Sequence, residues 1–119
     1  MKKIILSIAL LFFVHFCYSQ TKEDYSSVLN TLKDAFNAKN VDQVYNLFSS
    51  DLKSSLSKEK LSQLFKDTHA DKGAMGDSEL ILEEDSSNRY LTDFENASML
   101  IVLKLTSEGK LSVFSIEEY

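Results

Sequence analysis

The chain has 119 residues, 44% of them hydrophobic, and carries a formal net charge of −5 at pH 7. This length allows one domain, and 18 acidic residues against 13 Lys and Arg disfavour nucleic acid and anionic membranes as partners. The single cysteine, Cys17, excludes an intramolecular disulfide.

The first twenty residues have the order of a secretory signal peptide. Two lysines at residues 2–3 precede an apolar run over residues 4–16. The small side chains of Cys17 and Ser19 predict cleavage after Ser19, which leaves Gln20 as the new N-terminus. A signal that ends in Ser-Gln resembles those of secreted proteins in the Bacteroidetes group of bacteria.

The predicted organisation is therefore a signal peptide over residues 1–19 and one domain over residues 20–119. Removing the signal takes away two lysines and no acidic residue, so the mature domain has a formal charge of −7. Acylation of Cys17 is the alternative and would make a lipoprotein. Because Phe16 stands where a small residue normally precedes such a cysteine, we favour secretion or periplasmic export with no stable membrane anchor.

Apolar spacing in the first half of the mature chain predicts three amphipathic helices. Their N-caps are expected at Thr21, Asn40 and Ser57, whose side chains can accept hydrogen bonds from the backbone of the first turn. The buried stripes are expected at Tyr25, Val28, Leu29, Leu32, Ala35 and Phe36, then at Val41, Val44, Tyr45, Leu47 and Phe48, and then at Leu61, Leu64 and Phe65.

The apolar period changes to two in the second half, after a flexible crossing predicted over residues 69–77. Met99 to Leu105 has apolar residues on both faces, which predicts a central, covered strand. Gly109 supplies the hairpin turn that follows. Strands are expected over residues 80–82, 89–95, 99–105 and 111–116. The sequence thus predicts an α+β domain, with three N-terminal helices packed on a curved antiparallel sheet of about four strands.

Three segments together resemble a known bacterial family: residues 35–42 (AFNAKNVD), residues 48–61 (FSSDLKSSLSKEKL) and residues 103–116 around Glu108-Gly109-Lys110. They look like a small secreted domain of unknown function in the nuclear-transport-factor-2-like superfamily. The resemblance implies a cone-shaped α+β fold over about residues 22–117. It also implies a place just before a serine hydrolase or β-lactamase-like domain, so the chain is either free-standing or the first part of a longer reading frame.

The sequence contains no recognisable catalytic set. Ser57 and Lys60 match Ser-x-x-Lys, the nucleophile motif of penicillin-binding proteins, but its Ser-Asp-Asn and Lys-Thr-Gly partners are absent, and a helix N-cap explains the serine better. Asp67, His69 and Asp71 alternate and could share one side of a strand as a weak carboxylate–imidazole site, although we favour a solvated loop. We expect no metal and no cofactor.

Tyr25, Tyr45 and Tyr90 are the candidates for lining the cone, because a buried phenol can offer a hydrogen bond to a ligand. Packing in the core is the interpretation we favour over ligand binding. We predict an exported, non-catalytic accessory domain that binds a peptide, a small ligand or an adjacent hydrolase domain, with a homodimer left open. The alternative is a small cone-fold isomerase or hydrolase for an apolar small molecule. A pocket above about 300 Å³ with a carboxylate of raised pKa would favour the enzyme, and a cone filled by side chains would favour the binding module.

Overall fold

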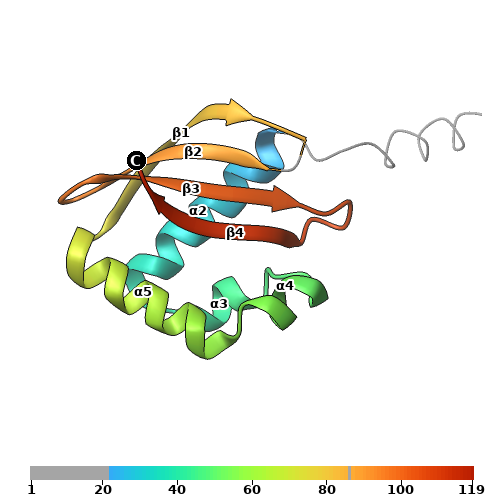
Figure 1. The fold of residues 1–119 in the computed structure, drawn as a ribbon, viewed down its shortest axis with the longest axis horizontal. Coiled ribbons are helices and arrows are strands. Elements are labelled where there is room, and N and C mark those ends of the chain that lie inside the picture. The colour runs from blue at the N-terminus through green and yellow to red at the C-terminus, as the bar shows by residue number, and fades with distance from the viewer. Residues whose placement is uncertain (1–21, 86) are drawn as a thin grey trace, which may run out of the picture.

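The computed structural model describes residues 22–85 and 87–119, so the predicted signal peptide, its Ser19-Gln20 cleavage site and the predicted cap at Thr21 lie outside the described residues. Helices precede strands along the chain, which confirms the α+β class (Figure 1). The helices are α2 (Lys22–Ala38), α3 (Val41–Tyr45), α4 (Ser50–Ser55) and α5 (Lys58–Lys72). The strands are β1 (Met75–Glu83), β2 (Asn88–Phe94), β3 (Ser98–Leu105) and β4 (Leu111–Glu118).

The four strands form one antiparallel sheet in the order β1-β2-β3-β4, as the period-two pattern predicted. Strand β3 pairs with β2 on one side and with β4 on the other. Its Ile101 and Leu103 are fully buried, and Val102 on the opposite face is only 4% exposed. The predicted central, covered strand is therefore confirmed.

One face of the sheet packs against the helices, and the core lies between them. Figure 1 shows α2 crossing behind the sheet, with α5, α3 and α4 along its lower side. Phe36 of α2 meets Phe65 of α5 edge to face, with 5.1 Å between the ring centroids, and meets Phe94 of β2 at 5.5 Å. Alternate residues of β2 and β3 supply the sheet side of this core, because successive side chains of a strand point to opposite faces.

Two of the predicted N-caps are confirmed. The side chain of Asn40 accepts a hydrogen bond from the backbone N–H of Gln43 at 3.4 Å, and α3 begins at the next residue. The hydroxyl of Ser57 accepts one from Lys60 N at 3.2 Å, and α5 follows. Both residues therefore satisfy backbone donors that the helix itself leaves unpaired.

The prediction of three helices is wrong, since α4 forms a fourth within the described residues. The expected second helix continues to Phe48, whereas α3 ends at Tyr45. The cause is a contact with β4: Leu111 N donates to Leu47 O, and Ser49 N donates to Leu111 O, each at 2.7 Å. Because these backbone groups bond to β4, they cannot continue helix α3. A new helix, α4, therefore begins after Ser49, whose hydroxyl is its N-cap.

The flexible crossing expected over residues 69–77 is also wrong. Helix α5 continues to Lys72, and Gly73 ends it with φ of 85°, a conformation that glycine adopts without steric cost. Strand β1 begins two residues later at Met75, so Gly76 belongs to the strand. A Cβ on Gly76 would lie 2.7 Å from the Asp93 carbonyl oxygen, which explains the need for glycine there.

Candidate functional site

The structure brings two of the three predicted tyrosines together. The rings of Tyr25 on α2 and Tyr90 on β2 have centroids 6.3 Å apart, and the two residues are 7% and 6% exposed. The Tyr25 hydroxyl accepts a hydrogen bond from Leu105 N at 3.1 Å, and the Tyr90 hydroxyl accepts one from Asn88 Nδ2 at 3.3 Å. Both hydroxyl oxygens are thus used inside the fold.

Burial raises the pKa of the Tyr90 phenol, and the hydrogen bond from Asn88 acts in the opposite direction with a smaller effect. The raised pKa keeps this phenol neutral at physiological pH, because an unperturbed tyrosine already titrates near pH 10. Tyr90 is therefore a neutral hydrogen-bonding group in the core, and the direction of its shift is away from that of a general base.

Tyr45 has different neighbours. Its ring lies 5.6 Å from the Phe48 ring, and the Lys53 ammonium lies 5.2 Å from its centroid, within the range of a cation–π contact. Tyr45 therefore packs beside α4 and the start of β4, where Phe48 bridges to Leu111. The structure does not assemble the three tyrosines into one site.

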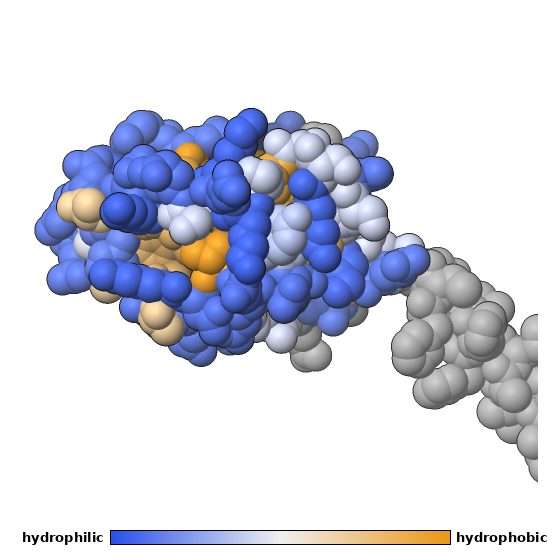
Figure 2. Space-filling model, turned by 90° about the horizontal axis from the view of Figure 1, so that it is seen from below, coloured by the Kyte–Doolittle hydropathy of each residue, from blue (hydrophilic) through white to orange (hydrophobic). Residues whose placement is uncertain are grey.

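A pocket of about 460 Å³ opens instead between three helical segments. We call it the helical pocket. Its lining residues are Phe36, Lys39, Val41, Ser62, Phe65, Lys66, His69 and Ala70. Its volume lies within the range of about 300–1,000 Å³ that is typical of small-molecule sites. Figure 2 shows apolar surface on the helical side of the molecule between rows of hydrophilic side chains.

Helix α5 forms one wall of the helical pocket. Its five lining residues follow the spacing i, i+3, i+4, i+7 and i+8, which places them on one face of a helix. This spacing is the sequence signal from which the pocket-lining face of α5 could have been predicted. The sequence analysis did not predict that face, because it assigned only the core positions Leu61, Leu64 and Phe65 to the packed side of the helix.

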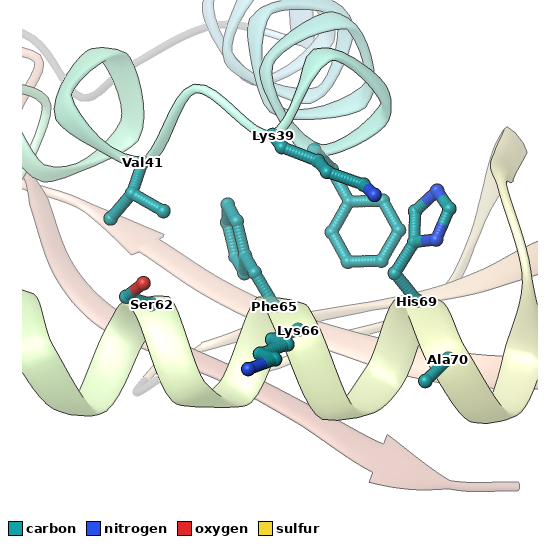
Figure 3. A pocket seen from close by; sticks show the side chains of 8 residues that line it. Lys39, Val41, Ser62, Phe65, Lys66, His69 and Ala70 are labelled. Carbon is teal, nitrogen blue, oxygen red and sulfur yellow. The ribbon is translucent and has the colours of Figure 1, made fainter.

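The opposite wall is the turn between α2 and α3. Lys39 N donates to Phe36 O at 3.1 Å and Asn40 N donates to Ala35 O at 2.8 Å, the two bonds of a Schellman motif that closes α2. Asn40 then caps α3, so the chain reverses within a few residues and presents Lys39 and Val41 to α5. Figure 3 shows Lys39 extending from this turn toward His69, and Phe65 rising from α5.

The pocket has an apolar floor and a basic rim. Phe36 and Phe65, 1% and 4% exposed, belong to the core and form its base. Lys39, Lys66 and His69 are its basic residues, and no Asp or Glu is among the lining residues. The His69 and Phe36 rings have centroids 5.5 Å apart and are tilted by 35°. Such a site can hold an apolar group and offer N–H donors to a polar end.

The predicted alternation of Asp67, His69 and Asp71 does not make a site. All three lie on α5, so the favoured solvated loop is wrong too. Residues two apart on a helix point in nearly opposite directions. Asp67 instead accepts a hydrogen bond from Gln63 at 2.7 Å, and His69 faces the helical pocket. Across residues 22–85 and 87–119, no cluster of three His, Cys, Asp or Glu is arranged to hold a metal ion.

A second hollow of about 190 Å³ lies between α2 and β1. Lys33 and Asp77, both in its lining, form an ion pair at 3.1 Å. It is smaller than the usual range for ligand sites, so we regard the helical pocket as the candidate site.

In the described part of the chain, no helix is long and apolar enough to span a bilayer.

Residues 30–114 match a family described as protein of unknown function (DUF3887). The chain belongs to this family. The DUF3887 match runs from the middle of α2 into β4 and contains every lining residue of the helical pocket, whereas Tyr25 lies outside it. Neither a curated protein nor a solved structure matches the chain.

Proposed function

We propose that this DUF3887 chain is an exported, non-catalytic binding module, and that its ligand occupies the helical pocket. The observation that carries the proposal is the 460 Å³ volume over a floor of Phe36 and Phe65. Burying an apolar group against such a floor contributes about 25 cal/mol per Å² of apolar surface removed from water. The nuclear-transport-factor-2-like cone is part of the proposal, supported by helices on one face of a four-stranded antiparallel sheet.

The alternative of a cone-fold enzyme has less support. The helical pocket is large enough for the small-molecule substrate of such an enzyme. However, no carboxylate lines it to act as a general base. The hydroxyl oxygens of Tyr25 and Tyr90 already accept hydrogen bonds within the fold. Binding without chemistry is therefore the function that this set of side chains supports best.

The test is to fill the pocket. Ser62 and Ala70 are exposed residues of its α5 wall, so Ser62→Phe and Ala70→Phe would place a ring in the cavity with little effect on the core. The neutral fluorescent probe N-phenyl-1-naphthylamine should bind the native protein. Each variant should weaken that binding at least about tenfold, which corresponds to about 1.4 kcal/mol.

The control is Ser54→Phe, which adds the same ring on the exposed surface of α4, away from the lining residues. It should bind the probe like the native protein. Equal binding by all four proteins would place the apolar site elsewhere and contradict the proposal.

A further inference from the structure

We propose that the helical pocket takes an alkyl carboxylate of the fatty-acid type, with its chain on Phe36 and Phe65 and its head group at the rim that Lys39 and Lys66 line. This inference rests on the proposed function, because it names the ligand class of the same pocket. It adds the requirement that the ligand carries a negative charge.

The first argument is the balance of charge at the rim. The chain is acidic overall, with a formal charge of −5, yet two lysines and a histidine are among the lining residues of this pocket and no carboxylate is. Three other lysines form ion pairs: Lys33 with Asp77, Lys58 with Asp42, and Lys72 with Asp71 and Glu118. Within residues 22–85 and 87–119, neither Lys39 nor Lys66 has a carboxylate partner. An anionic head group would supply the missing charge.

The second argument is the backbone of Lys39. Its φ is 59°, and it is the only residue other than glycine with a positive φ in the described chain. Lys39 occupies the left-handed position of the Schellman motif. Glycine, and next asparagine, adopts that backbone conformation with less strain than lysine. Lysine is therefore an unfavourable residue for the end of α2. Backbone strain of this kind is characteristic of functional sites. What lysine adds there is a cation at the rim of the pocket.

The third argument is how polar and apolar groups are arranged. Lys39 comes from the α2–α3 turn and extends toward His69, whereas Lys66 leaves α5 next to Phe65, so the two lysines belong to different walls of the pocket (Figure 3). The His69 ring adds a further nitrogen at the end toward which Lys39 extends (Figure 3). An apolar floor with cations on two walls matches an amphiphile better than a neutral hydrocarbon or a cationic peptide side chain.

The experiment compares three ligands with the same ten-carbon chain, measured by isothermal titration calorimetry. Decanoate should bind more tightly than 1-decanol, and decyltrimethylammonium should bind most weakly. Raising the salt concentration from about 0.05 M to about 0.5 M strongly increases the screening of charges. Among the three ligands, only decanoate should then bind more weakly.

Variants then locate the head group. Lys39→Asn and Lys66→Gln should each weaken decanoate binding about two- to fivefold, as expected for partly exposed ion pairs, and leave 1-decanol unchanged. Lys60→Gln is the matched control, because Lys60 is an exposed lysine of α5 that does not line the pocket. Lys39→Gly should raise the urea midpoint of unfolding while it weakens decanoate binding, a pair of opposite effects that a purely structural role for Lys39 would not produce.

The outcomes separate the two proposals. If decanoate and 1-decanol bind equally and Ser62→Phe blocks both, the pocket binds apolar ligands but the carboxylate inference is wrong. If neither ligand binds the native protein, both proposals fail. An effect of Lys60→Gln as large as that of Lys66→Gln would show general attraction to the surface and would also overturn the inference.

Discussion

Ser57 shows how one residue can match a catalytic motif and serve a structural purpose. It stands in an extended conformation just before α5, and its Oγ accepts a hydrogen bond from the backbone N–H of Lys60 at 3.2 Å. The three-residue spacing that suggested Ser-x-x-Lys is also the spacing from an N-cap to the donor that it satisfies. Both side chains are exposed, and no base is buried beside the serine.

We predict that Ser57→Ala lowers the free energy of unfolding by about 1 kcal/mol, the typical cost of losing an N-cap. Urea denaturation measures this loss. Native protein and variant should both remain unlabelled by a fluorescent penicillin and by a fluorophosphonate, since the exposed Ser57 has no buried base to activate it. Labelling of the native protein that disappears in Ser57→Ala would contradict the prediction and revive the nucleophile.

At the scale of elements, two phenylalanines attach the helices to the sheet. Phe36 is 1% exposed and contacts Phe94 of β2, while Phe48 is 2% exposed and contacts Phe114 of β4 with ring centroids 5.9 Å apart. The ring partners lie on the two strands that flank β3.

Truncation of either ring should therefore destabilise the fold strongly. We predict that Phe36→Ala and Phe48→Ala each cost about 3–5 kcal/mol, a large part of the about 5–15 kcal/mol that stabilises a domain. Denaturant midpoints measure the loss, and Tyr119→Ala, which removes a ring that is 75% exposed, is the control. Midpoints that hardly move for both Phe variants would contradict the packing described for α2 and for the segment before α4.

At the scale of the whole molecule, residues 22–119 contain the helices, the sheet and the helical pocket, apart from the undescribed position 86. Residues 1–19 have the separate pattern of a leader: two lysines, an apolar run and small residues near its end. The lining residues of the helical pocket lie between residues 36 and 70. The proposed function is therefore assigned to residues of the predicted mature domain alone.

We predict export with cleavage after Ser19, so the mature protein should begin at Gln20 or at its cyclised form. Mass spectrometry of the protein recovered outside the cytoplasm measures this directly. Cys17→Ser should leave the mature mass unchanged, because the cysteine departs with the signal. A full-length cytoplasmic species, or an acyl group on Cys17, would contradict the prediction.

The sequence by itself determined the features that depend on neighbours a few residues apart. Helical and strand periods predicted the α+β order, Asn40 and Ser57 predicted two helix starts, and Gly109, with φ of 80°, predicted the hairpin turn. Each is local because a cap or a turn is completed by hydrogen bonds within about four residues.

Only the tertiary structure decided what depends on segments far apart in the chain. The early end of α3 required the backbone of Leu111, some sixty residues away, and the pairing of Tyr25 with Tyr90 required the sheet to fold onto α2. The helical pocket likewise needs the α2–α3 turn to lie against α5. Periodicity indicates which side of an element is buried, but the partner that buries it, and any space left between them, is set by how the packed elements meet.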